Sequence, residues 1–258
     1  MRQPSLYVSH GSPMIVLEQS PANAFLREYG RGWEKPNAIL VVSAHYKAPG
    51  PAIVASAAPP TIHDFGGFPE ALYRLRYPAP GAPALAARAH DLLAAAGFSP
   101  RLDAAHGYDH GVWTPLILMA PEADIPVLAV SIDPRQSPAW HYEMGRALAP
   151  LRDDGVLIIG SGAATHNLFF RMRPPLGVEA AVERFRAWLE TAVREGRVDD
   201  LLHYRDRAPF AVAHHPTEDH ILPLFAALGA GDGAGRRIHA SVDGGVIAMD
   251  TFAFDQAA

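Results

Sequence analysis

Cysteine is absent from the 258 residues of this chain, and its absence excludes several classes of site. Disulfides, thiolate nucleophiles, iron–sulfur clusters and Cys-ligated zinc all require this residue. Any transition-metal site must therefore be built from imidazole, carboxylate and water ligands. The Gly-x-Ser-x-Gly nucleophile elbow, the P-loop and the Gly-x-Gly-x-x-Gly fingerprint are absent as well.

Basic charge and long apolar runs are also scarce. Lys and Arg number 22 against 27 Asp and Glu, which gives a net charge of −5 with neutral histidine. The basic patches that nucleic-acid binding requires are thus not expected. No run of 18 apolar residues predicts a transmembrane helix, and the N-terminal sequence lacks the apolar segment of a signal peptide. We expect a cytoplasmic protein that binds small molecules, with no nucleic-acid or membrane partner.

The hydrophobic content predicts a well-packed α/β protein. Hydrophobic residues make up 49% of the chain and charged residues 19%, which is enough apolar material for a sizeable core. Short β-branched runs alternate with helical patterns, and this favours a single domain over residues 1–258. Its central sheet should be mostly parallel or mixed and flanked by helices. The expected strands are Leu6–Ser9, Ala38–Ser43, Ile53–Ser56, Ile125–Ile132, Val156–Gly160, Ile238–Val242 and Val246–Phe252, and the expected helices include Pro83–Ala96, Pro138–Leu151 and Gly177–Glu195.

Histidine is present in excess, with 13 copies, roughly twice ordinary usage. His10 and His45 each follow a predicted strand, and His166 lies six residues beyond another. Ligands of open α/β sheets gather at the C-terminal ends of the strands. We therefore expect these three imidazoles to converge on a metal site at that edge.

His220 is a fourth candidate ligand. Thr217 predicts a helix N-cap, which would place His220 at the entrance of a helix running to about Leu228. The neighbouring Glu218 and Asp219 are potential ligands, because iron sites often combine two histidines with one carboxylate.

His110 and two nearby loops complete the expected site. His110 precedes the helical segment Val112–Met119, where a helix N-terminus would lower the pKa of the imidazole. Asp109 is expected either to orient it or to cap the loop. The loop His63–Pro69, with two consecutive glycines, is expected at the rim of the site. Structural roles are expected for His90, His141, His203 and His239.

Six segments, in this order, resemble the class III extradiol ring-cleavage dioxygenases, in the 4,5-DOPA dioxygenase branch. The resemblance runs from about His10 to about Asp250, nearly the whole chain. The segments are His10-Gly11-Ser12-Pro13, Val41-Val42-Ser43-Ala44-His45, His63-Asp64-Phe65-Gly66-Gly67-Phe68-Pro69, Tyr77-Pro78-Ala79-Pro80-Gly81, Asp109-His110-Gly111-Val112-Trp113 and Pro216-Thr217-Glu218-Asp219-His220.

The resemblance implies a non-haem Fe(II) enzyme that inserts both atoms of O₂ into a catechol beside its two hydroxyls. Its metal ligands would be His10, His45 and His220. His166 would face the open side of the metal as acid–base catalyst or further ligand, and His110 would lie near the substrate. Zn(II) is a possible metal in a purified sample, because it binds imidazole sites more tightly than Fe(II) does.

Several alternatives stay open at the level of sequence. The wider superfamily supplies a glutamate as third ligand, so Glu218 or Asp219 is an alternative to His220. A zinc-dependent hydrolase would use the same ligands to activate water. A non-catalytic metal or small-molecule binder is a third possibility, since fold does not determine function. The natural catechol, the position of cleavage and the oligomeric state are not determined by the sequence.

Overall fold

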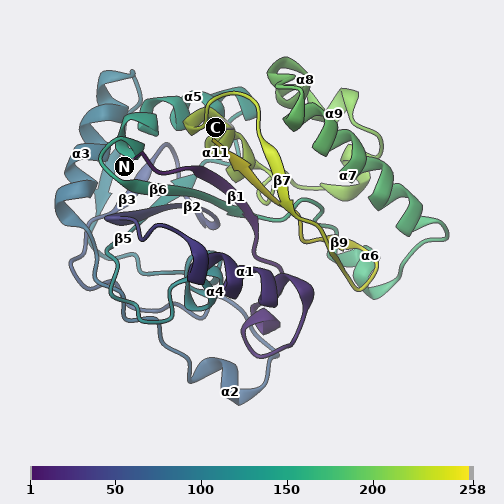
Figure 1. Ribbon diagram of the computed structural model, residues 1–258, viewed down its shortest axis with the longest axis horizontal. Helices are drawn as coiled ribbons and strands as arrows, with labels where there is room; N and C mark the ends of the chain where they lie inside the picture. The colour runs from purple at the N-terminus through teal and green to yellow at the C-terminus, as the bar shows by residue number, and fades with distance from the viewer. Residues whose placement is uncertain (1, 256–258) are drawn as a thin grey trace.

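A computed structural model describes residues 2–255 and confirms the α/β architecture (Figure 1). Eight strands form one mixed sheet in the order β4-β3-β5-β2-β6-β1-β10-β7. The strands are β1 Ser5–Ser9, β2 Ala38–Lys47, β3 Ala52–Val54, β4 Arg101–Asp103, β5 Val127–Ile132, β6 Val156–Gly162, β7 Arg236–His239 and β10 Thr251–Phe254, and a separate hairpin consists of β8 Val242–Asp243 and β9 Ile247–Ala248.

Four central strands, β5, β2, β6 and β1, run parallel to one another. Their side chains are buried on both faces, as expected for a parallel sheet covered by helices on both sides. β10 joins β1 in antiparallel orientation, with Leu6 opposite Ala253. The parallel arrangement brings the C-terminal ends of β1, β6 and β2 to one edge.

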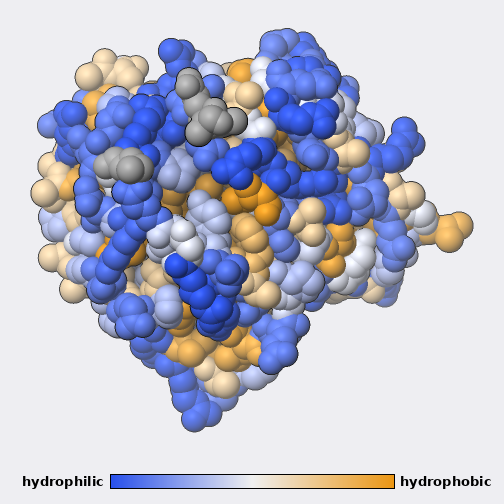
Figure 2. Space-filling model, in the orientation of Figure 1, coloured by the Kyte–Doolittle hydropathy of each residue, from blue (hydrophilic) through white to orange (hydrophobic). Residues whose placement is uncertain are grey.

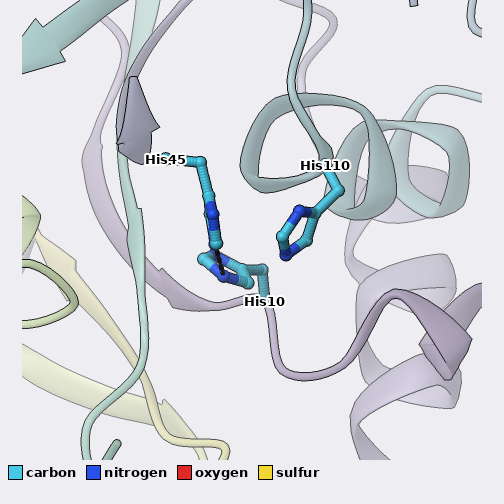
Figure 3. Close-up of side chains that lie close together, drawn as sticks. All are labelled: His10, His45 and His110. Carbon is cyan, nitrogen blue, oxygen red and sulfur yellow. Dashed lines mark hydrogen bonds between the residues drawn. The ribbon is translucent and has the colours of Figure 1, made fainter. Parts of the chain in front are cut away.

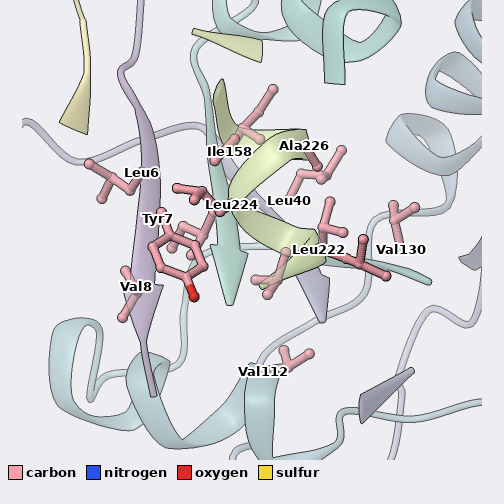
Figure 4. Packing of buried hydrophobic residues seen from close by; sticks show 14 of the residues in the cluster. Leu6, Tyr7, Val8, Leu40, Val112, Val130, Ile158, Leu222, Leu224 and Ala226 are labelled. Atoms are coloured by element: carbon pink, nitrogen blue, oxygen red, sulfur yellow. The ribbon is translucent and has the colours of Figure 1, made fainter. Parts of the chain in front are cut away.

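Helices cover the two faces of the sheet. In Figure 1, α5 and α11 lie on one side of the strands, and α1 and α4 lie on the other. Figure 4 shows Tyr7 of β1 pointing toward α11, whose Leu222 and Leu224 belong to the same buried cluster as Ile158 of β6. The helices are α1 Pro21–Gly32, α2 Glu70–Tyr73, α3 Pro83–Ala95, α4 His110–Met119, α5 Pro138–Leu148, α6 Leu168–Met172, α7 Val178–Arg194, α8 Val198–Leu202, α9 Tyr204–Arg207, α10 Ala211–His214 and α11 Leu222–Ala230, with 3₁₀ turns at Pro13–Val16 and Ala149–Arg152.

The C-terminal strands differ from the prediction. The expected strand Val246–Phe252 is interrupted, because β9 ends at Ala248 and β10 begins at Thr251. Between them, the Asp250 carboxylate is fully buried and accepts two hydrogen bonds from Arg186 of α7. A carboxylate can be buried at this depth only when it is paired, so the chain leaves the strand to reach Arg186.

The helix predicted from Thr217 begins later, at Leu222. The His220 carbonyl accepts hydrogen bonds from the Ala163 amide and the Tyr7 hydroxyl, so the turn around it is tied to β1 and the end of β6 instead of continuing a helix. β6 permits this close approach through glycine, because a Cβ at Gly162 would lie 2.0 Å from the His220 carbonyl oxygen.

Hydrophilic side chains cover much of the face seen in Figure 2, with apolar areas between them. Within residues 2–255, no helix combines the length and apolar character needed to cross a membrane. The largest exposed apolar side chains include Leu168, Phe169, Met172 and Leu176, on α6 and the segment that follows it.

A histidine-rich candidate metal centre

Three neighbouring parallel strands bring histidines to one edge of the sheet, as predicted. His10 directly follows β1, and His166 lies four residues beyond the end of β6. His45 lies within β2, which extends four residues further than predicted and changes register between Ser43 and Lys47. Such an irregularity re-aims a side chain. Figure 3 shows His10, His45 and His110 pointing toward one another from two strand ends and the first residue of α4.

The Nε2 atoms of three histidines converge at this edge. Nε2 of His45 lies 3.1 Å from Nε2 of His10 and 3.2 Å from Nε2 of His220. Nitrogens bound to one metal ion at about 2.1 Å, with bond angles near 90–110°, are about 3.0–3.4 Å apart. Each of these two spacings therefore fits a pair of nitrogens on one metal ion.

The other ring nitrogen, Nδ1, of each of these histidines faces an acceptor. Nδ1 of His10 is 2.9 Å from the Ser161 hydroxyl, which itself donates to a backbone carbonyl and so must accept here. Nδ1 of His45 donates to Asp64 at 3.2 Å, and Nδ1 of His220 donates to Asp219 at 3.2 Å. Protons on all three Nδ1 atoms leave the Nε2 lone pairs facing one another.

Three facing lone pairs repel one another unless a proton or a cation lies between them. Burial, together with the neighbouring imidazoles, lowers the pKa of His10 well below its ordinary value, which disfavours a proton. Burial also lowers the pKa of His220 to about 3. The donor set therefore fits a divalent metal ion, and the Nδ1 contacts are the outer interactions that typically orient metal-bound histidines.

Two groups of potential ligands have donor atoms within 4.8 Å of one another. One consists of His10, His45 and His110, and the other of His166, Asp219 and His220. The groups adjoin, because His45 and His220 are in contact through their Nε2 atoms. The site thus contains five imidazoles and more potential ligands than a single ion needs.

Asp64 is the functional residue that sequence reasoning missed. Its Oδ2 accepts hydrogen bonds from Nδ1 of both His110, at 2.9 Å, and His45, and its Oδ1 accepts from the His110 amide. Burial raises the pKa of Asp64, but the hydrogen bonds from the two histidines outweigh it and hold the pKa well below its ordinary range. Of the two roles expected for Asp109, the structure does not show the one of orienting His110: Asp109 stands at the N-cap position of α4 and accepts a hydrogen bond from Ser43.

His110 and His166 lie on either side of the three converging nitrogens. Burial lowers the pKa of His110, although the hydrogen bond to Asp64 opposes the shift. The His166 ring stacks on His220, with centroids 3.4 Å apart and planes at 8°. Burial lowers the pKa of His166 to about 4, so its imidazole is neutral at pH 7.

The two carboxylates beside His220 have other partners. Glu218 accepts a hydrogen bond from the Tyr204 hydroxyl at 2.8 Å, which holds it apart from the imidazoles. Asp219 forms an ion pair with Lys47 as well as its contact to His220. Glu218 therefore supports the neighbouring helix α9, whereas Asp219 holds His220 and also belongs to the second group of potential ligands.

A cavity of about 410 Å³ opens directly onto the imidazoles. Four of them line it, His45, His110, His166 and His220, and Phe65 and Phe68 form part of its wall. The loop at residues 63–69 thus borders the site, as predicted. Apolar walls around a few polar groups are typical of a small-molecule site.

The histidines for which structural roles were expected do not line this cavity. His141 of α5 is fully buried, and its Nδ1 donates to the Ser137 carbonyl while its Nε2 accepts from the Asp133 amide. His239 stacks on Phe25, and His203 caps α8.

Comparison with known proteins gives consistent matches over most of the chain. A family model described as the catalytic LigB subunit of aromatic ring-opening dioxygenase matches residues 4–247. A 4,5-DOPA dioxygenase extradiol from Beta vulgaris is 43% identical over 258 residues, covering 97% of this chain and 96% of the relative. A protein of the same name from Escherichia coli strain K12 is 44% identical over 236 residues, covering 90% of this chain and 86% of the relative.

A solved structure also matches over nearly the whole chain. The crystal structure of an uncharacterized protein from Escherichia coli K12 superposes with a TM-score of 0.79 at 34% sequence identity. The match covers 98% of this chain and all of that one.

Proposed function

The chain belongs to the LigB family of aromatic ring-opening dioxygenases and is an extradiol enzyme of the DOPA dioxygenase type; from this premise we propose that it cleaves a small catechol with O₂ at an Fe(II) ion held by His10, His45 and His220. Membership of the family implies a catechol-like aromatic substrate and O₂. Family membership therefore argues against the two alternatives left open by the sequence, a zinc-dependent hydrolase and a non-catalytic binder.

The convergence of three Nε2 atoms, each backed by an acceptor at Nδ1, is the observation that carries the ligand assignment. His110 is the alternative third ligand, since it groups with His10 and His45. We favour His220 because its Nε2 contacts that of His45 and its Nδ1 is held by Asp219.

Iron supports this chemistry better than zinc does. Bound Fe(II) would supply electrons for O₂ and Lewis acidity for the two catechol oxygens, whereas Zn(II) has no redox chemistry. Three protein ligands leave open positions for both reactants.

His166 acts as the proton acceptor and donor in this proposal. Neither of its ring nitrogens has a hydrogen-bond partner among residues 2–255, so both can exchange a proton with a substrate. Its neutral imidazole accepts a proton from a catechol hydroxyl and returns it later to an oxygen of the opened ring.

His110 positions the substrate. With Nδ1–H donated to Asp64, its Nε2 presents a fixed lone pair that accepts a hydrogen bond from a substrate hydroxyl. If the His110 imidazole took up the proton of that hydroxyl, the Asp64 carboxylate would stabilise the resulting positive charge.

Anaerobic reconstitution with Fe(II), followed by addition of L-DOPA or plain catechol in air, tests this proposal. Oxygen uptake should accompany a new yellow absorbance, and both should vanish when Zn(II) replaces iron. A filled iron site that consumes no oxygen with any catechol would refute the proposal.

A further inference from the structure

The charged residues of the catalytic cavity lie apart from its imidazoles. Glu18 and Arg171 are the only Asp, Glu, Lys or Arg side chains lining the cavity in the described part of the chain. Glu18 follows the 3₁₀ turn at residues 13–16, and Arg171 belongs to α6. One carboxylate and one guanidinium therefore face the space that a bound catechol would occupy.

The Arg171 guanidinium is held in place by one ion pair and keeps further N–H donors for another acceptor. One terminal nitrogen, Nη1, pairs with Asp243 of the β8–β9 hairpin, so the guanidinium is held in place. Its other N–H groups have no partner among residues 2–255. A guanidinium offers five donors in a planar fork, which suits a second carboxylate.

Glu18 is a carboxylate with no hydrogen bond or ion pair to its side chain in the described residues. It also lines a smaller cavity of about 120 Å³ beside the catalytic one. Asp243, Ser12, Ser20 and Ser241 also line that smaller cavity, and none of its lining residues in the described part of the chain is basic. Its lining suits a small cation that donates several hydrogen bonds.

We propose that Arg171, Glu18 and Asp243 form a subsite for an α-amino acid group on the catechol, with Arg171 binding the carboxylate and the two acidic residues binding the ammonium. This inference rests on the proposed function, because it places the catechol ring at the imidazoles. The subsite carries two negative charges and one positive charge. A carboxylate alone would meet an acidic surface, whereas a zwitterion complements both signs.

Four catechols with different side chains test the carboxylate contact and the ammonium contact separately. L-DOPA carries both charged groups, dopamine only the ammonium, 3-(3,4-dihydroxyphenyl)propanoate only the carboxylate, and 4-methylcatechol neither. Arg171→Met should lower kcat/KM about tenfold for L-DOPA and the propanoate. The loss should stay below about twofold for dopamine and 4-methylcatechol.

Glu18→Gln should give the complementary pattern. The loss should be about tenfold for L-DOPA and dopamine and below about twofold for the other two substrates. Arg173→Met, at the end of the same helix but outside the cavity lining, is the matched control and should leave all four values unchanged.

A readout without turnover completes the test. The Kd of L-DOPA for the zinc-loaded protein should rise about tenfold in either variant, while the Kd of 4-methylcatechol stays the same. Equal losses on all four substrates, or no loss on any, would overturn the subsite. Failure of the unmodified enzyme to open any catechol would instead refute the proposed function, so the two failures are distinguishable.

Discussion

At the scale of single residues, the second nitrogen of each imidazole distinguishes the histidines of the site. His10, His45 and His220 have Nδ1 held by an acceptor, and Nε2 of His45 contacts Nε2 of the other two. His166 has neither nitrogen held, which suits a group that exchanges protons. The described geometry thus separates ligand candidates from a proton-transfer candidate of the same residue type.

Alanine substitutions at these histidines should separate metal binding from turnover. His45→Ala removes the imidazole that contacts two others, so the purified protein should retain no metal. His166→Ala should keep a full metal content and lose turnover by about 100-fold or more. Metal analysis and oxygen uptake check both. Stoichiometric metal in His45→Ala would contradict the ligand assignment, and metal loss in His110→Ala but not in His220→Ala would favour the alternative set.

Asp64→Asn should weaken metal binding by about 10- to 100-fold. The amide presents an NH₂ group to two Nδ1–H donors, and relief of this clash moves a proton to Nε2, where it blocks the metal. Competition with a chromophoric chelator measures the affinity. Asp91→Asn, on the exposed face of α3, is the matched control, and equal affinity in both variants would disprove the positioning role of Asp64.

The sequence predicted the histidines but not Asp64, for a physical reason. His10 and His45 follow apolar strands whose shared direction is readable from their composition. Asp64 reaches His110 across 46 residues, through a loop whose course no periodicity describes. Because Asp109 directly precedes His110 in the sequence, Asp109 was the candidate for orienting it, but its side chain contacts Ser43.

At the scale of secondary structure elements, the contact between β6 and the turn at His220 positions the last ligand candidate. Gly160 and Gly162 leave room for the backbone of residues 220–223, and a Cβ at either position would lie about 2 Å from a carbonyl oxygen. This contact also explains the late start of α11. Helix signals at Thr217 are local, whereas the hydrogen bonds to the His220 carbonyl come from distant elements.

Gly162→Ala should therefore destabilise the protein and the site together. Overpacking against fixed backbone should lower the free energy of unfolding by about 1–3 kcal/mol, and displacement of His220 should weaken metal binding. Urea unfolding and metal titration measure the two effects. Gly32→Ala, at the end of α1 with no atom within 4 Å of the added Cβ, should change stability by less than about 1 kcal/mol. Equal effects of the two substitutions would contradict the close-contact argument.

The buried strands were predictable, whereas the edge strand β4 was not and the other edge strand, β7, overlaps the expected strand Ile238–Val242 only in part. β1, β2, β5 and β6 are covered on both faces and appear as continuous apolar runs. β4 at the sheet edge has only three residues, Arg101–Asp103, none of them buried, so its sequence resembles a loop. The break before β10 depends on the ion pair of Asp250 with Arg186, which is a tertiary contact.

At the scale of the whole molecule, buried neutral histidines make stability depend on pH. His141 does not line the cavity at the candidate metal site, and burial lowers its pKa from 6.5 to about 4. Between these values the unfolded chain binds the proton and the folded protein does not. The contribution of neutral His141 to the free energy of unfolding is therefore fully present above pH 6.5 and is lost as the pH falls toward 4.

His141→Asn should reduce this acid sensitivity. In metal-free protein, the variant should be less stable than the parent at pH 7.5, and the gap should narrow by about 2 kcal/mol at pH 5. Urea unfolding at the two pH values gives the comparison, with His203→Asn as the same change at an exposed side chain. A gap that stays constant or widens on acidification would contradict the buried, neutral state of His141.

The position of β1 has a consequence for how the protein is made. Residues 5–9 are synthesised first, yet their two hydrogen-bonded neighbours are β6, about 150 residues later, and β10, about 245 residues later. On the ribosome, this apolar segment remains without either partner through most of translation. Nascent chains should therefore need chaperone protection at their N-terminal segment, and fragments from interrupted translation before His220 should lack a metal centre able to react with oxygen.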